Sequence, residues 1–145
     1  MLDVAQQFAD RVKRLLFEQP KIIGDKSRLH VHETVQLEGW TTLNSQCGSI
    51  TIGEWSFIGQ NCMLLAAGHG HDISKRMEAR KALSEDQEQN IIIGKGVFIC
   101  SGAIILGPCK IGDHAVIAAG SVVLPGEYEA ESLYAGNPAV FKKRV

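Results

Sequence analysis

The stretch IGKGVF ICSGAI ILGPCK IGDHAV IAAGSV VLPGEY, residues 93–128, repeats one pattern every six positions. An aliphatic residue opens each hexad, and a smaller side chain follows four positions later. A period of six matches neither the helical period of about 3.6 nor the alternation of a long strand. It indicates a repeated unit that buries its apolar side by stacking on its neighbours. The aliphatic residues are Ile93, Ile99, Ile105, Ile111, Ile117 and Val123, and the smaller ones are Val97, Ala103, Cys109, Ala115 and Ser121.

The same rule holds upstream in hexads that open with Ile52 and Ile58, and more loosely from Val31 and Leu37. We expect each hexad to form a short strand and a corner, with three hexads closing a triangular coil of about eighteen residues. The predicted fold class is therefore an all-β solenoid. The alternative, an ordinary β-sandwich, would space its strands by about eight to twelve residues, which does not fit unbroken hexads.

Composition agrees with a single domain. The chain has 145 residues, of which 45% are hydrophobic and only 6% aromatic, so its core is expected to be aliphatic. A net charge of -1 does not favour nucleic acid or an acidic membrane as partner. No stretch is long enough to span a membrane, and the N-terminal residues lack the pattern of a secretory signal. We therefore expect a reduced, cytoplasmic protein in which Cys62 and Cys109 are buried apolar fillers.

The residues before the repeats form a predicted helix. Apolar side chains such as Val4, Phe8 and Val12 share one face, and Pro20 ends the segment. We expect residues 1–20 to cap the open first coil, whose edge and core would otherwise be exposed. A membrane-surface helix is the alternative, but the mixed charges of this segment disfavour it.

The six-residue repeat is interrupted once, after Leu64, and resumes at Ile93. The intervening residues are charged and contain no hexad, so we predict a loop at about residues 70–91 that leaves a β-helix of residues 21–128 at one corner. Residues 129–145 form the predicted C-terminal tail. Long loops in compact domains are usually functional or disordered, and this one opens with His69 and His71.

Three segments together resemble the hexapeptide-repeat acyltransferases, within them the galactoside, maltose and nodulation-type O-acetyltransferases. They are TIGEWSFIGQNCMLLAAGHG (51–70), IIIGKGVFICSGAIILGPCKIGDHAVIAAGSVV (91–123) and AGNPAVFKKR (135–144). The resemblance covers roughly residues 50 to 144. It implies a left-handed parallel β-helix, a homotrimer with active sites between subunits, acetyl-CoA as acyl donor and no metal.

The resemblance places a catalytic histidine at His69, directly after Gly68. An imidazole there would take the proton of an acceptor hydroxyl as the hydroxyl attacks the thioester. Direct transfer needs no covalent enzyme intermediate when both substrates are held together. His71 is the rival base.

The resemblance also implies the donor site. The Ser101 backbone N–H would stabilise the oxyanion, although the family's Trp-Ile-Gly before this serine reads Phe98-Ile99-Cys100 here. The pantetheine arm would lie along small residues, and basic residues of the tail would meet the phosphates of coenzyme A. These candidates are Ala118, Ala119 and Gly120, and Lys142, Lys143 and Arg144. A solvated tail is the alternative reading of the basic residues.

The acceptor site departs most from the family, whose Asn and Asp residues at this place have no clear counterpart. Trp40 could stack on a sugar ring, with Asn44 and Gln46 hydrogen-bonding its hydroxyls, or Trp40 could be a packed corner residue. The sequence therefore favours a sugar-containing acceptor without naming it.

Three other functions remain open. The same fold could acylate serine, an amino-sugar nitrogen or an antibiotic hydroxyl. A γ-class carbonic anhydrase would bind zinc, but it needs a His-x-x-x-x-His pair. A non-catalytic docking solenoid would not bind coenzyme A. The five histidines are His30, His32, His69, His71 and His114, and none of them forms that pair.

Overall fold

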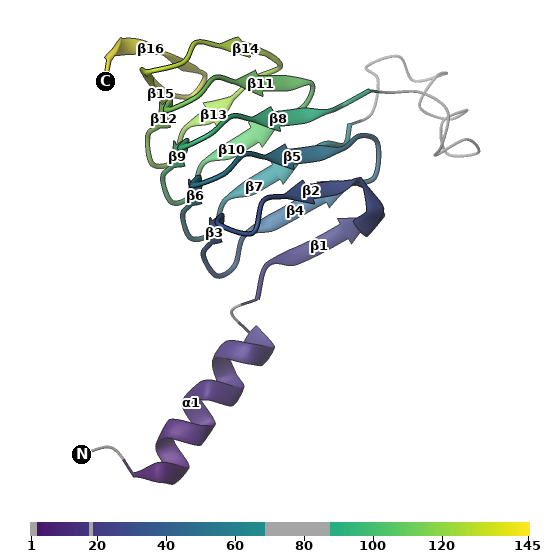
Figure 1. Ribbon diagram of the computed structural model, residues 1–145, viewed down its shortest axis with the longest axis vertical. Coiled ribbons are helices and arrows are strands. Elements are labelled where there is room, and N and C mark those ends of the chain that lie inside the picture. Colours follow the sequence, from purple (N-terminus) through teal and green to yellow (C-terminus); the bar gives the residue numbers. More distant parts are fainter. Residues whose placement is uncertain (1–2, 18, 69–87) are drawn as a thin grey trace.

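The computed structural model describes residues 3–17, 19–68 and 88–145 (Figure 1). Its elements are α1 (Val4–Phe17), β1 (Lys21–Gly24), the 3-10 helix η1 (Lys26–Arg28), β2 (Leu29–Val31), β3 (Gln36–Leu37), β4 (Thr42–Ser45), β5 (Ile50–Ile52), β6 (Phe57–Ile58), β7 (Met63–Leu65), β8 (Ile91–Ile93), β9 (Phe98–Ile99), β10 (Ile104–Leu106), β11 (Cys109–Ile111), β12 (Val116–Ile117), β13 (Val122–Val123), β14 (Gly126–Tyr128), β15 (Ser132–Gly136) and β16 (Ala139–Arg144).

The strands form three sheets that are the faces of a triangular coil. Sheet A has the order β1-β4-β7-β10-β13, sheet B β14-β11-β8-β5-β2 and sheet C β16-β15-β12-β9-β6-β3. Every pairing is parallel except that of β15 with β16. Ile93 pairs with Ile111, eighteen positions later, so the predicted coil length is confirmed. The fold is a parallel β-solenoid that matches a left-handed β-helix of hexapeptide repeats.

The hexad pattern names the core correctly. All the aliphatic and small positions predicted in residues 93–123 are buried, with exposed fractions of 4% or less. Cys109 is one of them, Cys62 is buried as predicted in an earlier coil, and all four cysteines are free. Because the same position recurs in each coil, like residues stack directly: Leu37, Ile58, Ile99 and Ile117 succeed one another through sheet C. In the described residues, no buried side-chain nitrogen or oxygen lacks a hydrogen-bond partner.

Insertions concentrate at one of the three corners. The turns from sheet B to C and from sheet C to A keep a nearly constant length, whereas those from sheet A to B differ widely. The turns from sheet A to sheet B cover residues 25–28, 46–49, 66–90, 107–108 and 124–125. The long turn contains the predicted loop, but Ile91 already lies in β8, fully buried and paired with Ile50 and Cys109. The predicted loop boundary at residue 91 is therefore slightly late.

The two ends of the solenoid differ. At the C-terminal end, Tyr128, Tyr134 and Phe141 make edge-to-face contacts, with ring centroids 4.9 and 6.0 Å apart, and cover the last coil. The predicted tail is thus part of sheet C. At the other end, α1 extends away from the coils (Figure 1), and Val4 and Phe8 are 77% and 69% exposed. Within the single chain, α1 does not cover the first coil as expected.

We predict that Ile111→Ala lowers the free energy of unfolding by about 2–5 kcal/mol, because it leaves a cavity in the stack. Its neighbour Lys110 lies on the outer side of β11 and is exposed, so Lys110→Ala should change stability by no more than about 0.5 kcal/mol. Urea denaturation of both variants tests the stacking, and equal losses would contradict it.

Candidate active site

The turns from sheet C to sheet A form a continuous edge, which we call the C–A ridge: residues 38–41, 59–62, 100–103 and 118–121. Backbone hydrogen bonds link one turn to the next. The N–H of Asn61 donates to Gly39 O at 3.1 Å, that of Gly102 to Gln60 O at 2.9 Å, and that of Gly120 to Ser101 O at 3.0 Å. Equivalent residues of the four turns therefore lie one above another along the solenoid.

The predicted donor residues meet on this ridge. Ser101, Ala119 and Gly120 are exposed, and Ala118 is half-buried with its N–H bonded to Tyr134 O. No acceptor takes the Ser101 N–H within the described residues. A Cβ built on Gly120 would meet nothing within 4 Å, so the backbone is open to close approach. The ridge thus offers a free donor at Ser101 beside an open run of small residues.

Cys100, which stands where the family motif has glycine, does not distort the turn. The left-handed conformation in this turn belongs to Gly102, with φ 74°, and Cys100 needs no positive φ. Burial raises the pKa of the Cys100 thiol, and the Ala119 backbone N–H beside it opposes that shift less strongly. Because the thiolate is the reactive form of cysteine, a neutral Cys100 is a poor nucleophile at neutral pH.

A second cluster lies at the other end of sheet A, where the long loop leaves and re-enters the coil. Asn44 Nδ2 donates to Gln46 Oε1 at 3.3 Å, and the Gln46 N–H donates to Asn44 Oδ1 at 3.1 Å. The Ala66 N–H donates to Asn44 O at 2.8 Å, which places the start of the loop one coil above this pair. His69 and His71 follow Gly68 but lie outside the described residues.

The returning end of the loop is held between two coils. The Ser49 N–H and hydroxyl both donate to Asn90 Oδ1, at 2.8 and 3.0 Å, and the Gln89 N–H donates to Cys47 O at 3.3 Å. A Cβ on Gly48 or Gly107 would collide with the backbone of Gln89. These two glycines are therefore needed for the backbone to pass between the coils.

The predicted acceptor residues do not come together in one chain. Trp40 lies on the C–A ridge, 60% exposed, whereas Asn44 lies in β4 and Gln46 follows β4 at the A–B corner. The four residues of β4, Thr42–Ser45, lie between Trp40 and Gln46 and span about 13 Å. Sheet A thus stands between the donor candidates and the start of the histidine loop.

The outer face of sheet A is apolar over β7, β10 and β13, which the hexad pattern does not reveal because it concerns only the inward positions. Met63 and Leu124 are 39% and 42% exposed, and the others are half-buried. Alternation along each strand was the available signal, since residues on either side of an inward residue must point outward. The six residues are Met63, Leu65, Ile104, Leu106, Val122 and Leu124.

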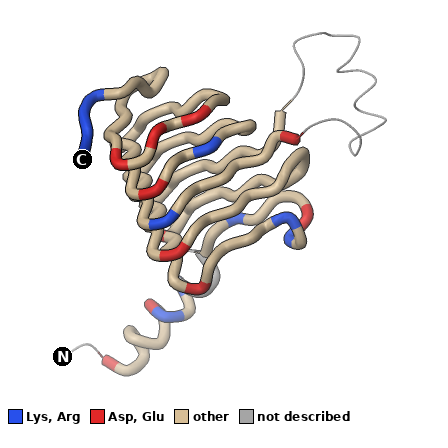
Figure 2. Tube along the Cα trace, turned by 45° about the horizontal axis from the view of Figure 1, so that its top comes forward, with Lys and Arg blue, Asp and Glu red and all other residues tan. Residues whose placement is uncertain are grey.

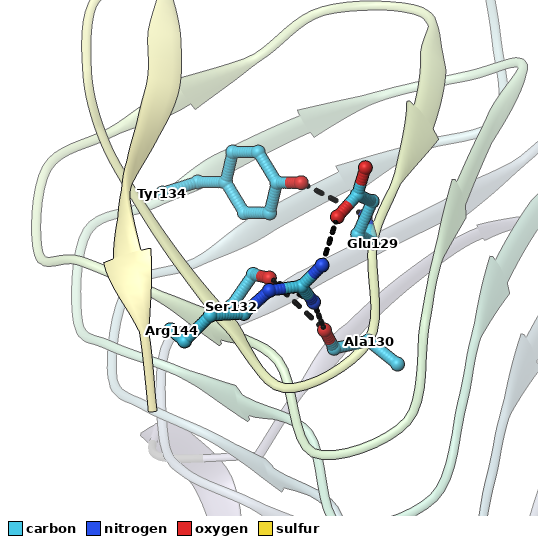
Figure 3. A network of polar contacts seen from close by, with 5 residues as sticks. All are labelled: Glu129, Ala130, Ser132, Tyr134 and Arg144. Atoms are coloured by element: carbon cyan, nitrogen blue, oxygen red, sulfur yellow. Dashed lines mark hydrogen bonds and ion pairs between the residues drawn. The ribbon is translucent and has the colours of Figure 1, made fainter.

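The three basic tail residues are not equivalent. In Figure 3 the Arg144 guanidinium bonds Glu129 Oε2 at 2.6 Å, Ala130 O at 2.8 Å and Ser132 Oγ at 3.0 Å. These partners lie at the corner between sheets B and C, because β16 runs back along β15 from Gly136 to Ser132. The structure therefore does not bring Arg144 to the ridge. Lys142 and Lys143 are exposed in the basic segment at the C-terminus (Figure 2).

In the described part of the chain, no group of three or more His, Cys, Asp or Glu side chains is placed to hold a metal ion. None of the helices described there combines the length and apolar character needed to cross a bilayer.

Comparison with known proteins identifies the repeat. The family described as Bacterial transferase hexapeptide (six repeats) matches residues 90–125. Residues 90–125 of the chain therefore carry the repeat of this family. A Saccharomyces cerevisiae protein named provisionally as an acetyltransferase is 30% identical over 123 residues, or 85% of the chain. The chain spans only 55% of that relative's length.

Solved structures share the whole fold. A maltose O-acetyltransferase from Clostridium difficile aligns with TM-score 0.64 and 24% identity, covering 100% of the chain and 79% of that protein. A hexapeptide-repeat acetyltransferase of Vibrio cholerae, solved with acetyl-CoA, aligns with TM-score 0.59 and 25% identity. The alignment covers 99% of the chain and 79% of that protein. A galactoside acetyltransferase in complex with coenzyme A aligns with TM-score 0.65 and 21% identity. The alignment covers 99% of the chain and 73% of that protein.

We predict that Cys109 is almost inert in the folded protein. Burial raises the pKa of its thiol to about 12. At pH 8 its thiolate population should therefore be on the order of 10³-fold below that of an unfolded cysteine, whose pKa is about 8.5. Iodoacetamide labelling followed by mass spectrometry measures this, with urea-denatured protein as the control. Rapid labelling of Cys109 in the folded protein would contradict its burial.

Proposed function

We propose that this protein transfers an acetyl group from acetyl-CoA to a hydroxyl of a sugar-containing acceptor, at sites between the subunits of a homotrimer. The observation that carries the proposal is the open C–A ridge, where the Ser101 N–H is free beside Ala119 and Gly120. The donor candidates predicted from the family's motifs are the residues gathered there. The acetyl-CoA and coenzyme A complexes of the similar proteins support the donor, and their names support the acceptor class.

The positions of the candidate residues at the two ends of sheet A support assembly from several copies. One end carries Ser101 and Ala119, and the other carries Gly68, after which the candidate base follows. A single chain keeps these ends apart, whereas a neighbouring copy can bring its loop to the ridge. The apolar outer face between them gives the copies a surface to bury. A cyclic trimer closes such a heterologous contact.

The reaction proposed is a direct transfer. His69 takes the proton of the acceptor hydroxyl while the oxygen forms a bond to the thioester carbonyl carbon. The Ser101 N–H donates to the oxyanion of the tetrahedral intermediate. The carbon–sulfur bond then breaks, and the protonated imidazole returns the proton to the departing coenzyme A thiolate. His71 is the alternative base, and a neutral Cys100 is not the nucleophile.

Binding of the donor is assigned to the ridge and the tail. The pantetheine arm lies along Ala118, Ala119 and Gly120, where no side chain blocks the backbone. Lys142 and Lys143 are exposed and supply charge for the phosphates. Arg144 is left out because Glu129 already pairs with it.

Two sets of residues, from different subunits, are assigned to the acceptor. Trp40 lies on the same ridge as Ser101, two turns away, and its exposed indole offers a flat face to a sugar ring. Asn44 and Gln46 come from the subunit that provides the histidine loop.

We predict that His69→Ala lowers kcat by about 10²–10⁴-fold, the usual cost of a lost general base, and leaves acetyl-CoA affinity unchanged. His71→Ala is the matched control and should retain most activity. Thiol release from acetyl-CoA with a panel of sugar acceptors measures turnover, and calorimetry measures donor binding. If His71→Ala were the inactive variant, the base would be His71.

Hybrid trimers test the shared site. Ala119→Arg should abolish donor binding by filling the ridge, whereas Ala130→Arg, at an exposed alanine of another corner, should not. Each site would combine a loop from one chain with a ridge from the next. Equal co-expression of His69→Ala and Ala119→Arg chains should therefore restore about a quarter of wild-type activity. The loop is intact in half of the chains and the ridge in the other half, so about a quarter of the interfaces join an intact loop to an intact ridge. A site within one chain would give no recovery.

A further inference from the structure

A concave region of about 620 Å³ lies on the outer side of sheet B, beside the corner between sheets B and C. Its volume is within the range of small-molecule sites. It is open to solvent and spans the first three coils, with polar side chains from His30, His32, Thr51, Glu54 and Lys95. None of these residues belongs to the C–A ridge or to sheet A, so the proposed reaction makes no use of them.

Trp55 follows the cavity-lining residue Glu54 in the sequence and is exposed in a costly conformation. It has φ 60° and is 73% exposed. The left-handed region is unfavourable for a residue with a bulky side chain. The equivalent position of the following turns holds Gly96, His114 and Glu131, with φ 58°, 58° and 52°. Three different residue types thus occupy this left-handed position, so the backbone geometry of the turn does not itself require an indole.

The polar groups at the cavity can both donate and accept hydrogen bonds. Lys95 Nζ pairs with Glu54 Oε1 at 2.9 Å, and this hydrogen bond lowers the pKa of the Glu54 carboxyl. Glu54 therefore remains an acceptor at neutral pH, while Lys95 and the hydroxyl of Thr51 can donate. His32 Nδ1 lies 2.9 Å from Thr34 Oγ1, and Thr34 Oγ1 also accepts the Trp55 N–H at 2.8 Å.

Several ligand classes fit this arrangement poorly. A phosphate or sulfate would meet the Glu54 carboxylate, which neutralises the adjacent Lys95. A metal ion lacks the required set of donors, because the described residues contain no group of three. A purely apolar ligand would cover the Lys95–Glu54 pair and the Thr51 hydroxyl without forming hydrogen bonds to them. An exposed aromatic face beside neighbouring donors and acceptors instead suits a pyranose ring, which is apolar on one face and carries hydroxyls at its edge.

We propose that Trp55, with Glu54 and Lys95, binds a neutral oligosaccharide at a site separate from the acetyl-transfer site. The indole packs against a sugar ring, and the carboxylate–ammonium pair bonds adjacent hydroxyls. The proposal does not depend on the acetyltransferase reaction, because it rests on another corner of the coil.

The chain contains only two tryptophans, which makes the site directly observable. In a Trp40→Phe variant the indole emission comes from Trp55 alone. Titration with maltotetraose, cellotetraose and chitotetraose to millimolar concentration should give a saturable change in that emission for at least one of them. No saturable change with any of the three would overturn the proposal.

Trp55→Gly provides the second test. If the indole serves binding, this variant should lose at least tenfold in oligosaccharide affinity by calorimetry and should unfold at an equal or higher urea concentration. His114→Gly is the matched control, since His114 is exposed with φ 58° at the equivalent position two coils further on, and it should keep the affinity. If Trp55→Gly were less stable than wild type, or bound the oligosaccharide equally well, the indole would be structural and the proposal would fail.

Discussion

The structure depends on the vertical stacking of buried aliphatic side chains at fixed register. Ile52 pairs with Ile93 and Ile93 with Ile111, so that each side chain covers the one below it. A coil alone has no core, since a triangle of short strands buries its inner residues only between neighbouring coils. Any residue inserted within a strand would turn the inward residues outward. The inner positions are therefore restricted to aliphatic and small residues.

This restriction leaves the corners free to vary, and the chemistry is proposed there. The C–A ridge keeps the same short turn in each coil, and its backbone groups line up along the axis. The A–B corner accepts turns of very different length, including the long loop, without disturbing the sheets on either side. A regular corner suits an extended ligand, and a variable corner suits a loop that reaches away from its own coil.

The sequence predicts the core well because one physical rule, burial at every sixth position, acts directly on residue type. It predicts the site less completely, because residues close in sequence can lie at opposite ends of a strand. The sequence groups Trp40 and Gln46 as acceptor residues, yet β4 separates them by its full length. It also groups Arg144 with Lys142 and Lys143 by charge, and only the structure reveals the pairing of Arg144 with Glu129. The packing of α1 could not be predicted either, since amphipathicity indicates a partner without naming it.

The antiparallel strand β16 gives the molecule two unlike ends. Parallel coils could in principle continue from one molecule into the next, because a solenoid ends in unpaired strand edges. Such a filament needs all three sheets to continue in register across the junction. On sheet C the last edge is occupied by a strand of opposite direction, while the aromatic cluster of Tyr128, Tyr134 and Phe141 fills the space above the core. Closing one end is enough to prevent head-to-tail growth, so the coil number is set within each chain and not by its neighbours.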